Sequence, residues 1–135
     1  MKFHRDPKLA VIRRLPLFAN CSESEIQEIA AIADELWLPQ GKELIHEGAL
    51  GQEFLVLVSG SAEVYKRGEQ VATLGPGGFV GEIALLTGRP RTATVVSTSS
   101  VLLLVIARHR FLTLVDHLPG VRAQLDEVVP LRQAS

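Results

Sequence analysis

The residues best suited to chemistry lie in one segment, from Leu74 to Val95. Four glycines within seven positions precede a short apolar run, Glu82 to Leu86, and Arg89 and Arg91 follow it. Glycines before a short helix let a ligand approach the backbone, and the first amide N–H groups of a helix have no partner within it. These donors and the helix dipole favour a phosphate-sized anion, which an arginine can bind through its planar guanidinium. Because no Gly-Lys-Ser/Thr follows the glycines, the segment is not a Walker phosphate-binding loop.

This segment resembles the phosphate-binding cassette of the cyclic nucleotide-binding domain family, whose members include the catabolite activator protein. The residues that carry the resemblance are Gly81-Glu82-Ile83-Ala84-Leu85-Leu86, Gly88 and Pro90-Arg91-Thr92-Ala93-Thr94-Val95. Three further stretches are similar to the start of the family's β-roll: Leu15 to Phe18, Leu44 to Gly48 and Phe54 to Gly60. Two residues depart from the family's pattern, Gln52 in place of an acidic residue and Val80 in place of phenylalanine. We interpret both as packing variants.

The resemblance implies a role for each cassette residue. Arg91 would pair with the cyclic phosphate, and the backbone amides of Ile83 and Ala84 would help to hold it. Glu82 would accept a hydrogen bond from the ribose 2′-hydroxyl. A carboxylate beside a phosphate repels it unless a donor lies between them, and a ribose hydroxyl is such a donor. The predicted ligand-binding residues are Gly81, Glu82, Ile83, Ala84, Arg91 and Thr92.

Thr92 leaves the choice of nucleotide open. Its hydroxyl could donate to the phosphate or to the base, and in the family a hydroxyl at this place occurs in proteins that tolerate cGMP and in many that bind cAMP. We therefore expect a cyclic purine nucleotide, with cAMP favoured over cGMP.

Short strands separated by glycine-containing turns are expected in the middle of the chain. The expected strands are Leu44–His46, Phe54–Val58, Ala62–Lys66, Val71–Leu74, Thr94–Ser97 and Val101–Ile106. Because no long helix separates them, a sandwich, roll or jelly roll is favoured over a parallel doubly wound sheet. The resemblance implies the same mainly-β class, a β-roll (double-stranded β-helix or jelly roll) flanked by helices.

Two helices are expected before the strands. The first runs from Pro7 to Leu15 and stops at Pro16, because the residue before a proline disfavours helix. The second starts at Ser22, where Glu25 completes capping-box spacing, and its pattern ends at Pro39.

Two more helices are expected after the strands, over Arg108 to His117 and Val121 to Val129, with Pro130 closing the second. The last helix carries an apolar stripe formed by Val121, Leu125, Val128 and Val129. This stripe has three readings: a lid over the purine, a face docked on the roll, or a seam with another copy of the chain. Leu125 is the predicted lid residue.

The length of 135 residues fits one domain. Within it we expect N-terminal helices over 1–36, a β-roll over 37–107 with the cassette at 75–95, and C-terminal hinge or lid helices over 108–135. The composition, 47% hydrophobic and 21% charged, is that of a compact soluble protein. No stretch is long and apolar enough to cross a membrane. A net charge of −1 without a run of basic residues argues against direct binding to nucleic acid.

The N-terminus has charges where a signal peptide needs apolar residues, and the single Cys21 cannot form an internal disulfide, so we expect a cytoplasmic protein. The four histidines, His4, His46, His109 and His117, lack the spacing of a metal site. No Gly-x-Ser-x-Gly nucleophile elbow is present either. We therefore expect no metal, no cofactor and no enzyme activity.

The resemblance implies a regulatory or sensory domain that binds cAMP or cGMP and relays occupancy through its C-terminal helices. Its partners would be the cyclic nucleotide and an effector domain or protein, with homodimerisation through the last helix as a further option. Two alternatives remain at this point. One is a protein-interaction module with a vestigial pocket, and the other is a metal-dependent enzyme on a cupin-like roll.

Overall fold

The computed structural model describes residues 7–134, and for residues 130–134 it describes the backbone alone. Three helical elements come first: α1 (Pro7–Arg14), the 3₁₀ turn η2 (Pro16–Phe18) and α2 (Glu23–Ile32). The predicted capping box is confirmed at the start of α2. The Glu25 amide donates to Ser22 Oγ over 3.2 Å, and the Ser22 amide donates to Glu25 Oε1 over 2.7 Å.

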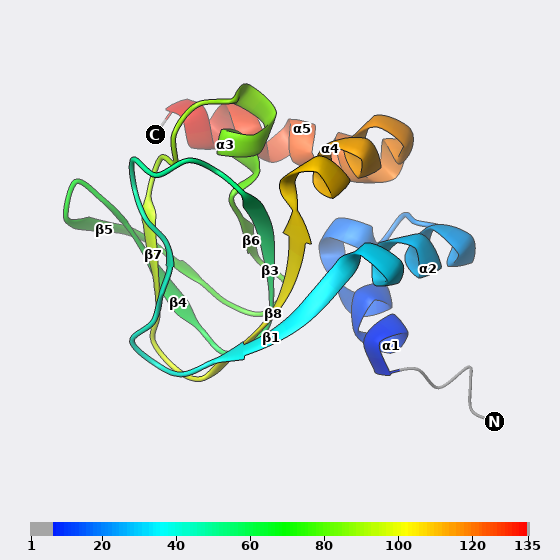
Figure 1. The fold of residues 1–135 in the computed structure, drawn as a ribbon, viewed down its shortest axis with the longest axis horizontal. Coiled ribbons are helices and arrows are strands. Elements are labelled where there is room, and N and C mark those ends of the chain that lie inside the picture. Colours follow the sequence, from blue (N-terminus) through cyan, green and yellow to red (C-terminus); the bar gives the residue numbers. More distant parts are fainter. Residues whose placement is uncertain (1–6, 135) are drawn as a thin grey trace.

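Two four-stranded antiparallel sheets form the roll, which confirms the predicted fold class (Figure 1). Sheet A has the order β1-β8-β3-β6, and sheet B has the order β2-β7-β4-β5. The strands are β1 (Ala33–Leu38), β2 (Glu43–Ile45), β3 (Glu53–Ser59), β4 (Ala62–Lys66), β5 (Glu69–Leu74), β6 (Phe79–Val80), β7 (Thr94–Ser97) and β8 (Val101–Ala107). All six predicted strands are present, within two residues at each end.

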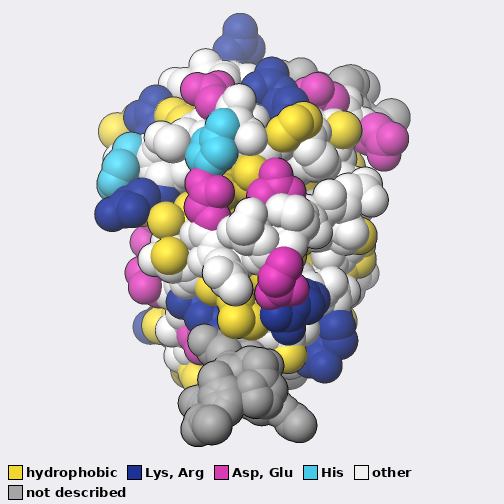
Figure 2. All heavy atoms as spheres, turned by 90° about the vertical axis from the view of Figure 1, so that its right-hand side faces the viewer, with side chains coloured by type: hydrophobic (Ala, Val, Ile, Leu, Met, Phe, Trp, Pro, Cys, Tyr) yellow, Lys and Arg dark blue, Asp and Glu magenta, His cyan; other side chains and the backbone are white. Residues whose placement is uncertain are grey.

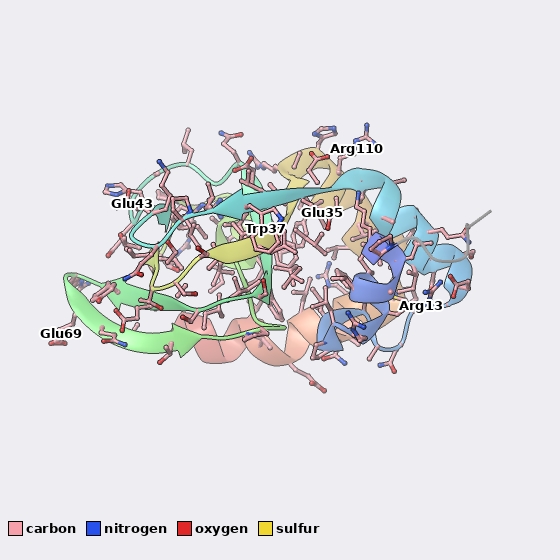
Figure 3. The ribbon with its side chains drawn as sticks, turned by 90° about the horizontal axis from the view of Figure 1, so that it is seen from below. Arg13, Glu35, Trp37, Glu43, Glu69 and Arg110 are labelled. Atoms are coloured by element: carbon pink, nitrogen blue, oxygen red, sulfur yellow. The ribbon has the colours of Figure 1, made fainter. Side chains whose placement is uncertain are left out.

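Strand β1 corrects the prediction that a helical pattern continues to Pro39 and that helices occupy residues 1–36. Helix α2 ends at Ile32, and β1 pairs with β8 from Ala33↔Ile106 to Leu38↔Val101. The prediction came from Ile26, Ile29, Ala30 and Ala33, which follow at helical spacing, and no proline or glycine interrupts the sequence before Pro39. Pairing with the buried strand β8 determines that residues 33–38 form a strand, because tertiary contacts can override the local helix propensity of a segment. Figure 3 shows Trp37 on this strand.

Helices α3 (Glu82–Thr87), α4 (Arg108–His117) and α5 (Pro119–Ala134) complete the fold. The predicted bounds of α4 are confirmed. Helix α5, however, begins at Pro119 and continues through Pro130, so the prediction that the last helix starts at Val121 and is closed by Pro130 is wrong. Proline suits the first position of a helix, and an internal proline removes one hydrogen bond without forbidding the next turn.

One hydrophobic core joins the helices to sheet A. Phe54 of β3 stacks on Phe111 of α4, with ring centroids 4.5 Å apart. Leu85 of α3 and Leu125 of α5 belong to the same core, and Leu125 is fully buried. Of the three readings of the C-terminal stripe, docking on the body of the domain is therefore the one that this structure displays.

The loop between β2 and β3 approaches α3 closely at Gly51. A Cβ atom on Gly51 would lie 2.8 Å from Ala84 Cβ, 3.2 Å from Leu85 Cδ2 and 3.5 Å from Arg91 Nη1. The first of these distances is shorter than van der Waals packing allows and the second is tight, so the absence of a side chain lets the loop pack against the cassette. Gly75 differs, because a Cβ there would meet nothing within 4 Å.

Gly51→Ala should therefore destabilise the domain by about 1–3 kcal/mol, the usual range for overpacking a filled core. The matched control Gly75→Ala should stay within about 1 kcal/mol of the parent, since its new methyl group has room. Chemical denaturation of the three proteins measures both values. Equal stability of Gly51→Ala and the parent would show that the loop at Gly51 packs less tightly against α3 than the structure indicates.

A second link joins α2 to α4. His117 Nδ1 contacts the Thr113 carbonyl oxygen over 2.7 Å, and Nε2 contacts a carboxylate oxygen of Glu28. Both acceptors require an N–H on the ring, which only the protonated imidazole supplies twice. The hydrogen bond to Glu28, helped by the Thr113 carbonyl, accordingly raises the pKa of His117 above its ordinary 6.5. Figure 2 shows this helical end, where side chains of both charge signs are interspersed.

The raised pKa predicts a pH dependence of stability. A group whose pKa is higher in the folded state stabilises it fully below the unfolded value and loses this effect as pH rises through the folded value. Above about pH 6.5, the free energy of unfolding of the parent should therefore fall faster than that of His117→Gln. The exposed His109 gives the control variant His109→Gln, which should follow the parent. If the free energy of unfolding of the parent and of His117→Gln changed in parallel from pH 6 to 9, the stabilising interaction between His117 and Glu28 would be refuted.

Candidate functional site

A cavity of about 230 Å³ opens between α3 and sheet B. One water needs only 10–15 Å³ of such space, so the cavity suits a small organic molecule better than a bare ion. All six residues predicted to bind a ligand line it: Gly81, Glu82, Ile83, Ala84, Arg91 and Thr92. The structure therefore brings the predicted set together, and the binding role of each residue stays a prediction. Leu125 does not line the cavity, because it lies in the helical core.

Gly81 shapes the turn that leads into α3. It has φ 101°, in the left-handed region that glycine adopts without strain. A Cβ atom at this position would also lie 2.7 Å from Arg91 Nη1 and 2.9 Å from the Glu53 carbonyl oxygen. Glycine is thus required both by the backbone conformation and by the guanidinium that lies against it.

Arg91 is the buried cation of the cavity, with 9% of its surface exposed. Its Nη1 donates to the Gly81 carbonyl over 3.1 Å, and its Nη2 donates to the Glu53 carbonyl over 2.7 Å. These bonds use two of the five N–H groups of a guanidinium. Burial lowers the pKa of Arg91, and the carboxylates of Glu53 and Glu82 oppose this effect. Because both direct acceptors are neutral carbonyls, an anion that reaches the guanidinium gains a strong charge-assisted hydrogen bond.

Glu82 is the buried carboxylate of the cavity. It is the first residue of α3 and has no exposed surface. The position suits an acid, since the helix dipole is positive at this end. Glu82 and Arg91 line one cavity, so a ligand that contacts both needs an anionic group for the arginine and a donor for the glutamate.

An apolar wall faces these two charges. Its main residues come from strands of the roll: Ile45, Val64, Val71, Ala72, Leu74 and Val95. Sequence reasoning missed this wall, although the alternation of Ala62, Val64 and Lys66 along β4 could have indicated which side chains face inward. An apolar wall opposite a charged one suits a flat, weakly polar ring attached to an anionic group.

Within residues 7–134, no three His, Cys, Asp or Glu side chains are grouped so as to hold a metal ion, and His4 lies outside the described residues. Burial, with a smaller contribution from Glu25, raises the pKa of the Cys21 thiol, so it stays protonated at neutral pH. None of the described helices has the length and apolar character needed to span a membrane.

Known proteins resemble this chain in sequence and in fold. A cAMP-dependent protein kinase regulatory subunit from Hypocrea atroviridis is 32% identical over 110 residues, which are 82% of this chain and 24% of that protein. The cyclic AMP receptor protein of Thermus thermophilus is 30% identical over 122 residues, 87% of this chain and 56% of that protein. The solved structure of the Thermus catabolite activator protein has a TM-score of 0.77 at 30% identity and covers 88% of this chain and 58% of its own.

A third solved structure, the regulatory subunit of a cAMP-independent protein kinase A from Trypanosoma brucei, has a TM-score of 0.83 at 22% identity. It covers 90% of this chain and 44% of its own, and at this identity it shows the fold alone. This chain spans about a quarter of the length of the Hypocrea relative. The sequence model described as the cyclic nucleotide-binding domain matches residues 35–117. The chain therefore belongs to the cyclic nucleotide-binding domain family.

Proposed function

We propose that this domain is a regulatory module that binds cAMP, in preference to cGMP, in the cavity between α3 and sheet B. One observation carries the proposal: a buried cation, Arg91, and a buried carboxylate, Glu82, line the same cavity at the start of α3. A nucleotide offers Glu82 a donor, its ribose hydroxyl, that is separate from the phosphate bound by Arg91, and this favours a nucleotide over inorganic phosphate. The domain acts by binding, without catalysis.

The cavity accommodates the three parts of the nucleotide on different walls. The cyclic phosphate pairs with Arg91 and with the amides of Ile83 and Ala84, which lie in the first turn of α3 and have no intrahelical acceptor. The ribose 2′-hydroxyl donates to Glu82. The purine lies against the apolar wall, and Thr92 stands exposed at the rim, where its hydroxyl reaches the phosphate or the base.

Two arguments support cAMP over cGMP. The Hypocrea relative is named for cAMP dependence, and the Thermus relative is named as a cyclic AMP receptor. In addition, guanine carries a carbonyl and an amino group that need partners, and burying polar groups without partners against an apolar wall is unfavourable. Adenine has fewer such groups.

Nucleotide binding affects the rest of the domain through α3. Leu85 of this helix packs in the core that contains Phe111 of α4 and Leu125 of α5. Phosphate capture at the first turn of α3 shifts the helix, and the packed core passes the shift to α4 and α5 as a change in population. The new position of α5 is then recognised by an effector domain, a partner protein or a second copy of the chain. In a lid role, Leu125 would leave the core to cover the purine.

Isothermal titration with cAMP and cGMP tests the binding. The nucleotide-free parent should bind cAMP one to one and more tightly than cGMP. Arg91→Ala should weaken binding by about 2–5 kcal/mol, or about thirtyfold to several thousandfold, because the phosphate loses a desolvated charged partner. The control Arg89→Ala removes an exposed arginine two residues away and should leave affinity unchanged.

No heat and no thermal shift with either nucleotide would establish a vestigial pocket and shift attention to protein partners of α5. The Trypanosoma structure makes this outcome meaningful, since it belongs to a kinase described as cAMP-independent. Tight binding retained by Arg91→Ala would disprove the role of the arginine alone.

The role of Glu82 is tested with 2′-deoxy-cAMP. A hydrogen bond to a charged group contributes about 1.5–3 kcal/mol and a neutral one about 0.5–1.5 kcal/mol, so the parent should bind cAMP at least tenfold more tightly than the deoxy ligand. Glu82→Gln keeps an acceptor but loses the charge, and the ratio should shrink to a few fold. A ratio that is the same in both proteins would place the ribose elsewhere.

A further inference from the structure

The cavity contains a second cation that the roles above leave unused. Its charged lining residues are Glu82, Arg91 and Lys66. Arg91 and Glu82 balance each other, so Lys66 gives the lining a net positive charge. A cyclic phosphodiester carries one negative charge, so its binding would neutralise the net charge of these three lining residues.

Lys66 lies near the cassette end of the cavity. It is the last residue of β4 and shares a strand face with Val64, whose partner in β7 is Val95. The last registered pair of these strands is Tyr65↔Thr94, and the residues next to it, Lys66 and Ala93, both line the cavity. Ala93 follows Arg91 by two residues, and neighbouring strands lie about 5 Å apart. Lys66 therefore lines the same cavity as the segment that presents the buried arginine.

Among the side chains that the structure describes, no carboxylate forms an ion pair with the ammonium of Lys66. Lys66 is half-buried, and none of the ion pairs among the described residues includes it. Glu69 faces it in the hairpin register, but that side chain is exposed, and Figure 3 shows it at the outer end of the β4–β5 hairpin. The position of Lys66 contrasts with that of Arg91, which is buried and fixed to two carbonyls.

We propose that Lys66 is the steering residue of this site: its ammonium draws the anionic nucleotide into the cavity, where Arg91 then holds it. The inference rests on the proposed nucleotide binding. A lysine ammonium on a flexible four-carbon stem can meet an anion at the rim, whereas a buried guanidinium acts only after the ligand has lost its water. Rim charges alter mainly the association rate and its salt dependence, and buried charged partners alter mainly the dissociation rate.

Stopped-flow mixing with a fluorescent cAMP analogue separates the two rates. Lys66→Gln should lower the association rate constant about three- to tenfold at low salt, with the dissociation rate constant within about twofold of the parent. The difference should shrink as salt rises, because the Debye length falls to about 8 Å at 0.15 M. Lys66→Arg should retain the parental rate, and Lys66→Glu should be slower than Lys66→Gln.

Lys42→Gln is the matched control, since Lys42 is an exposed lysine that does not line the cavity. It should associate at the parental rate. A parental association rate in Lys66→Gln, or an equal loss in Lys42→Gln, would overturn the assignment. A loss confined to dissociation would make Lys66 a holding residue and would also overturn it. Circular dichroism confirms that each variant is folded, and absence of binding by the parent would instead refute the proposed function.

Discussion

The site depends on the hydrogen bonds from the Arg91 guanidinium to the carbonyls of Gly81 and Glu53. They tie the end of the cassette to the turn before α3 and to the first residue of β3. Burying a cation is unfavourable unless its N–H groups find acceptors, and two carbonyls meet this demand without neutralising the charge. The glycines at 51 and 81 leave the space that this arrangement needs. The resulting cavity wall holds the guanidinium in a preorganised position.

Under the function proposed above, the same arrangement would let a binding event at the cassette affect distant helices. Helix α3 has one end in the cavity and its apolar residue Leu85 in the core shared with α4 and α5. Packed cores do not deform continuously, so a shift of α3 favours one arrangement of the helices over another. The ion pair between His117 and Glu28 sets a further constraint, because it fastens α4 to α2. In the proposed relay, the roll is the fixed frame and the helical layer is the part that responds.

Much of this arrangement was predictable from the sequence. Strands such as Ala62–Lys66 and the capping box at Ser22 have strong local signals, and the structure confirms them. The cassette residues were predicted together because their spacing resembles that of a family. Strand β1 was missed because its partner β8 lies over sixty residues away, so no local pattern encodes the pairing. The apolar wall was missed for a similar reason, since residues from separate strands converge only after the roll closes.

Amide and arginine side-chain NMR spectra of the nucleotide-free chain, recorded during titration with cAMP, test the central claim most directly. We predict saturable one-to-one shifts at the amides of Ile83 and Ala84 and at the Arg91 side chain, accompanied by shifts in α5. Unchanged spectra, or shifts confined to residues outside the cavity, would contradict the claim that cAMP binds at the buried arginine.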